Sequence, residues 1–389
     1  MNSFWYKIWF ILYFVGMGMI VPQVSPFIFT ELKILHPGLI FFVSQLMMPL
    51  GSLLTGYLSD KTMHVRFIAL PMTVGAALFI FLLTSFPSIQ QSYFFVLLFY
   101  TAISFCMGGI IPLVNISYIQ NGHNTDYFGR TRLYGTLGFA VPNFFLLFIH
   151  TSPGVIIKVS SFFILISALI LFKLPRGRQH HISGRDHISV AHVAELLSSP
   201  VFLIFMLINL IFYFGYSTTE FVISNYVGKI PFYFQPVPMI WLLGTSVEII
   251  FFYISPSIVR RVGSLYIIAG GLLAGVLRFA ILANVNLSAE VIIYSQGLHG
   301  IQFAGTYLGS LLYLKEKTSP QRLATAQALF LMFARSLGTA AGGYFLGNIA
   351  SENNYSLLFA MAALSGVVSF VFLLFFSKYE KKHKHFVKK

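Results

Sequence analysis

Long apolar segments alternate with short polar ones along nearly the whole chain. A helix that crosses a lipid bilayer needs about 20 consecutive, mostly apolar residues. Segments of this kind predict twelve membrane-spanning helices, near 8–30, 36–58, 66–86, 93–119, 132–150, 155–174, 200–226, 237–259, 264–284, 290–314, 322–347 and 353–377. The pattern therefore predicts an all-α membrane protein. Its first helix begins within ten residues of Met1 without a small-residue cleavage site, so we expect it to be retained.

One polar segment is much longer than the others and divides the predicted helices into six and six. We expect an N-terminal six-helix bundle at 1–174, a cytoplasmic linker at 175–199, a C-terminal six-helix bundle at 200–377 and a basic cytoplasmic tail at 378–389. The four histidines of the linker are expected to be solvated and not to bind a metal: His180, His181, His187 and His192.

Composition supports a membrane protein, and the position of its charges predicts its orientation. Of 389 residues, 57% are hydrophobic and 9% are charged, whereas soluble domains carry roughly 25% charged residues. The net charge is +14, and the basic residues gather in the even-numbered loops and both tails. The odd-numbered loops hold only Lys33, Lys158 and Lys229. By the positive-inside rule, both termini are expected on the cytoplasmic side of a cell membrane, which is an inner or plasma membrane. Nucleic acid is not needed to explain the positive charge.

Ionisable residues within predicted spans are candidates for function, because charge is costly inside a bilayer and is usually retained for a purpose. Glu248 lies mid-span and is expected to bind substrate or carry a proton; the alternative is a structural hydrogen bond between helices. Arg278 could pair with Glu248 and support proton coupling, or form a plain structural salt bridge. His299, flanked by Gln296 and Gln302, is equally compatible with proton or substrate binding and with helix packing.

Four segments of the chain have motif-like sequences. Residues 56–61 read Gly-Tyr-Leu-Ser-Asp-Lys, and 128–139 read Phe-Gly-Arg-Thr-Arg-Leu-Tyr-Gly-Thr-Leu-Gly-Phe. Residues 241–248 read Trp-Leu-Leu-Gly-Thr-Ser-Val-Glu, and 296–303 read Gln-Gly-Leu-His-Gly-Ile-Gln-Phe. These segments resemble the major facilitator superfamily, and in particular the branch of lactose permease, nucleoside–proton symporters and phenylpropionate permeases. The resemblance covers essentially the whole chain and implies a substrate site near the membrane midplane between two halves.

The resemblance also assigns roles to individual residues. It implies that Arg132 binds substrate hydroxyls and that Phe139 stacks on the substrate; one turn into its span, Arg132 could instead be a charge at the cytoplasmic membrane edge. As polar residues within spans, Thr136, Asn115 and Gln302 are further substrate-binding candidates. Lys61 stands where the superfamily has Arg. Four further residues are expected to be gating or structural charges: Asp60, Arg66, Glu220 and Arg335.

Two positions depart from lactose permease. Gln302 stands where that permease has its proton-carrying Glu, and its span-four substrate Glu is absent, with Asn115 nearby. The proton mechanism and the galactoside specificity therefore do not carry over, and sugar, nucleoside and aromatic acid remain open as substrates.

These observations predict a secondary active transporter that couples uptake of a small polar organic solute to protons. A proton-independent facilitator or an antiporter is the main alternative. A membrane enzyme with Glu248 and His299 as acid and base, or a receptor on this fold, is remote. We expect no cofactor, no catalytic residue and no metal, with the solute, protons and the bilayer as partners of a monomer.

Overall fold

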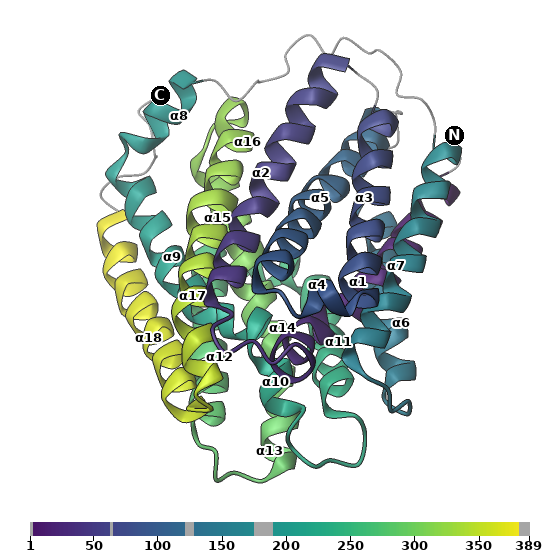
Figure 1. Ribbon diagram of the computed structural model, residues 1–389. Coiled ribbons are helices and arrows are strands. Elements are labelled where there is room, and N and C mark those ends of the chain that lie inside the picture. The colour runs from purple at the N-terminus through teal and green to yellow at the C-terminus, as the bar shows by residue number, and fades with distance from the viewer. Residues whose placement is uncertain (1–2, 63–64, 121–127, 175–189, 381–389) are drawn as a thin grey trace. The chain divides into compact units, whose positions relative to one another are not determined.

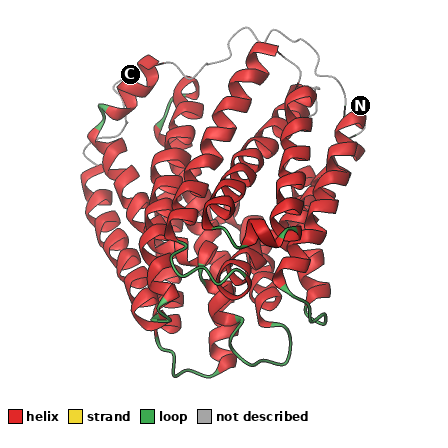
Figure 2. Ribbon diagram, viewed as in Figure 1, coloured by secondary structure: helices red, strands yellow, loops and turns green. Residues whose placement is uncertain are grey.

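The computed structural model describes residues 3–62, 65–120, 128–174 and 190–380 (Figure 1). Within these ranges the chain consists of helices joined by loops and turns, without a strand (Figure 2). The predicted all-α class is thereby confirmed. Contacts within the chain distinguish two compact units, one formed by 1–181 and 220–242 and the other by 182–219 and 243–389.

The first unit contains the N-terminal helices and the segment between α9 and α11. Its helices are α1 (Phe4–Pro26), the π-helical η1 (Phe27–Glu31), α2 (Gly38–Thr62), α3 (Val65–Ser85), α4 (Pro87–Gln90), α5 (Tyr93–Gln120), α6 (Phe128–Leu146), α7 (Pro153–Ile170), the 3₁₀ turn η3 (Leu171–Lys173) and α10 (Ile223–Val227). Two helices run from one unit into the other, namely α9 (Pro200–Phe221) and α11 (Pro236–Val262).

The second unit contains the remaining helices and two further π-helical segments. Its elements are α8 (Val190–Leu197), α12 (Ser264–Ala283), α13 (Ala289–Tyr294), the 3₁₀ turn η4 (Ser295–Gly297), α14 (Leu298–Phe303), the π-helical η5 (Ala304–Leu308), α15 (Gly309–Lys317), α16 (Pro320–Leu329), the π-helical η6 (Phe330–Ser336), α17 (Leu337–Ser351) and α18 (Tyr355–Glu380).

Ten helices of the described chain are long and apolar enough to cross a membrane, judged by length and composition. They correspond to ten of the twelve predicted spans. The predicted fifth span is the helix α6, and the predicted tenth span is divided into α13, η4, α14, η5 and α15. The described chain is helical throughout 289–317, with 3₁₀ and π-helical turns within this segment.

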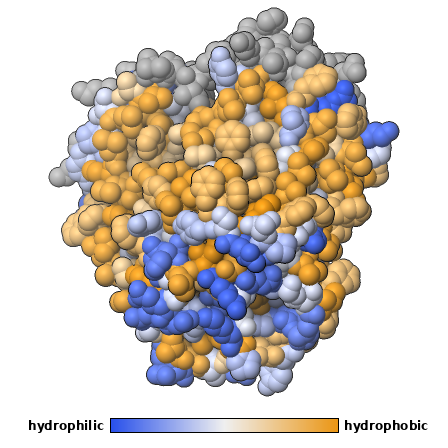
Figure 3. All heavy atoms as spheres, viewed as in Figure 1, coloured by the Kyte–Doolittle hydropathy of each residue, from blue (hydrophilic) through white to orange (hydrophobic). Residues whose placement is uncertain are grey.

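Many large apolar side chains lie on the outside of these helices, as expected for surfaces in contact with lipid. Phe94 is exposed on α5, Phe162 on α7 and Phe375 on α18. Figure 3 shows hydrophobic side chains over much of the visible surface of the helices. A soluble protein would cover such a surface with charged groups.

In the first unit, α1 packs against α6 and α7, while α2 packs against α5. Glycines permit these close approaches, since a Cβ at Gly51 or Gly108 would overlap backbone atoms of the facing helix. On α6, the buried amide of Asn143 donates hydrogen bonds to the carbonyl oxygens of Gly18 (3.1 Å) and Phe139 (2.8 Å). The bond to Gly18 fixes α6 against α1.

In the second unit, an aromatic core formed by α9, α15, η6 and α18 is built from Phe202, Phe205, Tyr213, Tyr313, Phe330 and Phe376. Small residues again set the helix spacing. A Cβ at Gly342 of α17 would overlap the carbonyl of Phe214 on α9, and one at Gly271 of α12 would lie 2.7 Å from the backbone nitrogen of Thr306.

The predicted linker at 175–199 is not entirely solvated. Its last part forms α8, whose Leu196 is fully buried in the aromatic core. The Glu195 carboxylate pairs with the Arg322 guanidinium of α16 at 2.7 Å. The linker histidines His180, His181 and His187 lie outside the described residues. The fourth, His192 on α8, is half-buried with its Nδ1 atom buried, so the expectation that it is solvated is wrong.

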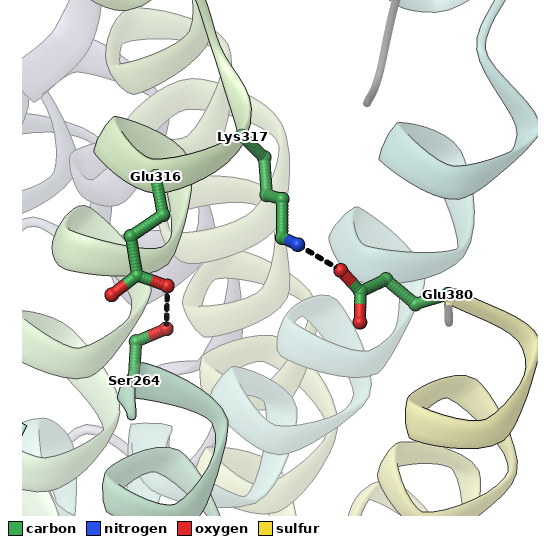
Figure 4. A network of polar contacts seen from close by, with 4 residues as sticks. All are labelled: Ser264, Glu316, Lys317 and Glu380. Carbon is green, nitrogen blue, oxygen red and sulfur yellow. Dashed lines mark hydrogen bonds and ion pairs between the residues drawn. The ribbon is translucent and has the colours of Figure 1, made fainter. Parts of the chain in front are cut away.

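Polar contacts also join the ends of three helices in this unit (Figure 4). The Ser264 hydroxyl at the start of α12 donates to the Glu316 carboxylate at 2.7 Å. Beside it, Lys317 at the end of α15 forms an ion pair with Glu380 of α18. Within the second unit, these bonds hold the helix ends next to one another.

Candidate functional site

Arg132, the residue expected to bind substrate, lies one turn into α6 with its side chain half-buried. Its guanidinium carbon lies over the Phe14 ring of α1, 4.3 Å from the centroid, and 5.6 Å from that of Phe10. A Cβ at Gly135 would come within 2.6 Å of an Arg132 Nη atom. The absence of a side chain there leaves room for the arginine, and the aromatic faces stabilise its charge.

Thr136 and Phe139 follow at positions four and seven residues beyond Arg132, so the three side chains share one face of α6. Both are half-buried. The Phe139 ring lies 6.0 Å from the Trp241 ring of α11, tilted by 59°. The Trp241 indole nitrogen donates to the Ser224 hydroxyl of α10 at 2.9 Å. α6 thus carries a guanidinium, a hydroxyl and an aromatic ring in a row, beside a second, anchored ring.

Asn115 lies on α5, half-buried, and its side-chain oxygen is buried without a hydrogen-bond partner among the described residues. Two bonds fix the helix around it. The Ser117 hydroxyl bonds Tyr6 of α1 at 2.9 Å, and the Tyr118 hydroxyl bonds Thr131 of α6 at 3.3 Å. Asn115 is therefore held on a rigid helix with an unused acceptor.

In the second unit, Arg278 of α12 is almost completely buried, with 1% of its surface exposed. Its Nε donates to the Gln296 amide oxygen at 2.8 Å, and one Nη donates to Thr219 (2.8 Å) and Gln302 (2.9 Å). Among the described residues, the hydrogen bonds of its guanidinium go to these three neutral groups, from η4, α9 and α14, rather than to Glu248.

His299 of α14 is buried and directs its ring toward aromatic neighbours. Its ring centroid lies 6.1 Å from that of Tyr216 on α9 and 6.2 Å from that of Phe303. The glutamines on either side, Gln296 and Gln302, instead face Arg278. Within this segment, His299 therefore contacts aromatic rings, whereas Gln296 and Gln302 accept hydrogen bonds from Arg278.

Glu248 lies on α11 with its side chain half-buried. Its backbone runs close to α14, since a Cβ at Gly300 would lie 2.5 Å from the Glu248 nitrogen. A second glycine, Gly244 of α11, lets His299 come near, because a Cβ there would lie 2.8 Å from the His299 ring. Within the second unit, α11 therefore presents Glu248 one turn from the point where it meets His299.

The residues expected to be gating or structural charges are spread over both units. Arg66 donates to the Phe172 carbonyl at 3.1 Å. Glu220 accepts from the Gln45 amide at 2.8 Å. Arg335 lies over the Tyr307 ring, 5.4 Å from its centroid. The side chain of Asp60 lies outside the described residues.

The site also contains residues that the sequence analysis did not single out. Thr219, Ser224 and Asn143 all bond a candidate residue or its helix, and each is an uncharged polar residue inside an apolar segment. An uncharged polar residue inside an apolar segment is therefore the sequence feature that could have identified them. In the described part of the chain, no group of three or more His, Cys, Asp or Glu side chains is placed to hold a metal ion.

Residues 3–379 match the MFS_1 like family. The chain belongs to this family. Among its relatives, this MFS_1 like protein is 26% identical to the "Uncharacterized transporter YwbF" of Bacillus subtilis (strain 168), with 96% of the chain and 92% of the relative covered. It is 23% identical to the "Nucleoside permease NupG" of Escherichia coli (strain K12), with 85% and 84% covered.

Solved structures show the same fold. The nucleoside transporter NupG superposes with a TM-score of 0.82 at 19% identity, covering 97% of this chain and 99% of that one. The POT family transporter PepTSo gives 0.72 at 12% identity, covering 98% of each. The resemblance expected from the motifs is thus confirmed. The MFS_1 like protein is a multi-pass membrane transporter, and the relatives named here are transporters and not enzymes.

Proposed function

We propose that the protein carries nucleosides across the cell membrane by alternating access, coupled to protons. The fifth and tenth helical segments complete twelve spans in this proposal, with cytoplasmic termini and a monomeric carrier. Arg132, Thr136 and Phe139 on one face of α6 are the observation that supports this function best. A guanidinium suits sugar hydroxyls, and aromatic rings suit a flat base.

A nucleoside is favoured over a sugar or an aromatic acid for two reasons. The Phe139 and Trp241 rings, 6.0 Å apart, offer two aromatic surfaces next to one hydrogen-bonding guanidinium. That combination matches a molecule with a planar base and a hydroxylated ring. In addition, one relative along most of the chain is named as a nucleoside permease.

Glu248 is the proton carrier in this proposal. It is half-buried on an apolar helix, where a carboxylate is costly and a neutral carboxyl is not. Protonation would let the carrier reorient at low cost, and His299, whose ring meets α11 one turn away at Gly244, is the second residue proposed to take part in proton coupling.

Uptake of radiolabelled uridine into proteoliposomes, with and without an inward proton gradient, tests both parts. We expect the gradient to drive accumulation by the native protein. Glu248→Gln should abolish accumulation while retaining exchange of uridine across the membrane, because the amide mimics the neutral carboxyl.

Glu290→Gln is the matched control, since Glu290 is exposed in the first turn of α13. It should accumulate uridine like the native protein. Full accumulation by Glu248→Gln would show that Glu248 is not the proton carrier. If the native protein transports none of uridine, adenosine or cytidine, the nucleoside proposal fails.

A proton-independent facilitator is the second candidate, and one observation favours it. The buried Arg278 is surrounded by Thr219, Gln296 and Gln302, none of which can take up a proton in the physiological range. If an imposed pH gradient does not change the final distribution of uridine, and adding uridine causes no pH change, this candidate is supported over the symporter.

A further inference from the structure

The first unit contains a pocket of about 200 Å³ that the proposed function does not use. Residues from α1, η1, the loop before α7, α10 and the start of α11 line it, among them Gln23, Thr30, Ser224 and Gln235. The pocket adjoins the loops at 149–153 and 228–236, which are odd-numbered loops in the predicted topology.

Gln23 is the residue that points to a ligand. It is 95% buried, with 5% of its surface exposed, and it lines the pocket. Its amide has two donors and an acceptor to offer to a bound molecule. A ligand in the pocket would meet them.

The remaining lining defines the class of ligand. Asn225 and Gln235 contribute further amides, and Ser224 and Thr151 contribute hydroxyls. Lys229 is the one charged residue of the lining, and it is exposed at the rim. Neutral donors and acceptors in this number suit an uncharged, hydroxyl-rich solute, and the apolar walls suit a compact ring.

A short chain of contacts connects the pocket to the face of α6. Ser224, in the pocket wall, accepts the hydrogen bond of the Trp241 indole at 2.9 Å. The other side of this contact is Phe139, 6.0 Å from the Trp241 ring. Trp241 therefore stands between the pocket and the ring expected to stack on the substrate.

We propose that this pocket is an outer subsite, which binds the ribose end of a nucleoside before Trp241 yields and the nucleoside reaches Arg132 and Phe139. This inference rests on the proposed function. In this subsite, Gln23 binds the ribose hydroxyls. The hydrogen bond from the Trp241 indole to Ser224 holds Trp241 between the pocket and Phe139 until the nucleoside moves on.

Cysteine labelling tests the pocket directly, because the chain has a single cysteine, Cys106, which is buried. In a Cys106→Ser background, the full-length Gln23→Cys variant in nanodiscs is alkylated by a small maleimide, with and without uridine or ribose. We expect either solute to slow alkylation at least threefold. Lys229→Cys, at the exposed rim, gives the same readout should Gln23→Cys fold poorly.

Adding Arg132→Ala separates the two sites. Protection at position 23 should persist in this variant although its uptake is lost. The absence of protection by both solutes, or protection that disappears with Arg132→Ala, would overturn the outer subsite. Protection without any uridine uptake by the native protein would retain the subsite and refute the proposed function.

Transport kinetics give a second measurement. Gln23→Met keeps the length of the side chain and removes its hydrogen bonds. We expect the KM for uridine to rise about three- to tenfold, the effect of one neutral hydrogen bond, with the maximal rate unchanged. Gln91→Met, at an exposed position after α4, is the control and should not change KM. An unchanged KM in Gln23→Met would contradict the proposal.

Discussion

Arg132 in the first unit and Arg278 in the second show two ways of keeping an arginine within the membrane. Arg132 is half-buried and stabilised by the faces of Phe14 and Phe10. Arg278 is almost completely buried and donates to three neutral side-chain oxygens. Both lie within predicted spans, and only the structure shows how their surroundings differ.

These two environments predict different roles for the two arginines. Arg132 is half-buried on the face of α6 that also carries Thr136 and Phe139, and aromatic faces stabilise its charge. The N–H groups of Arg278 instead donate to the amide and hydroxyl oxygens around it. We therefore expect Arg132 to determine transport and Arg278 to determine the integrity of its unit.

Replacing Arg278 should have the largest effect, and it should act on stability. Arg278→Met removes three hydrogen bonds and leaves the oxygens of Thr219, Gln296 and Gln302 buried without partners, at about 1 kcal/mol or more for each. We expect a loss of about 3–5 kcal/mol, seen as a lower midpoint of thermal unfolding in detergent. Arg322→Met, at a partly exposed position, is the matched control. A native-like midpoint in Arg278→Met would refute the structural role.

Replacing Arg132 should act on transport alone. Arg132→Ala is expected to lower the uptake of uridine about hundredfold, which corresponds to roughly 2.7 kcal/mol, with the unfolding midpoint little changed. Arg132→Lys should recover only part of the rate, because an ammonium lacks the planar fork of donors. Equal uptake by all three proteins would remove Arg132 from the site.

A smaller effect is expected from one partner of Arg278. Thr219→Val preserves shape and removes a single acceptor, so that this Nη atom of Arg278 donates only to Gln302. The loss of stability should be about 1 kcal/mol, measured by the same thermal unfolding. If Thr219→Val destabilises the protein as strongly as Arg278→Met, the three acceptors do not act as separate contributions.

The smallest effect belongs to a third arginine, Arg322, which is partly exposed and paired with Glu195 of α8. Glu195→Ala should cost no more than about 1 kcal/mol, as is usual for solvent-exposed ion pairs, and the cost should shrink at high salt. Leu196→Ala is the contrasting variant, because Leu196 is fully buried. Its loss should exceed that of Glu195→Ala and should not respond to salt.

Hydrophobic length alone predicted most of the fold. Ten spans and the all-α class follow from it, because a helix is the simplest structure that satisfies the backbone within lipid. The segment 289–317 could not be predicted in this way. Gln296 and Gln302 would lie roughly 120° apart on a regular α-helix, yet both reach Arg278. A 3₁₀ turn within the segment breaks the regular period.

The candidate site was predicted where its residues are charged or lie in a motif, as for Arg132, Phe139 and Glu248. Uncharged polar residues in apolar spans, such as Gln23 and Thr219, carry little weight in a hydropathy pattern. Their partners come from helices distant in sequence. Only tertiary packing shows which of them are satisfied and which remain open to a ligand.

The π-helical segments η1, η5 and η6 have a consequence for comparing this chain with its relatives. A π-helical turn accommodates one residue more than an α-helical turn, so the side chains beyond it are rotated by about 100° relative to a regular helix. A relative that lacks the extra residue would keep the same helix ends with one position fewer. Single-residue gaps within 304–308 or 330–336 are therefore the ones to expect when helical faces are matched between such chains.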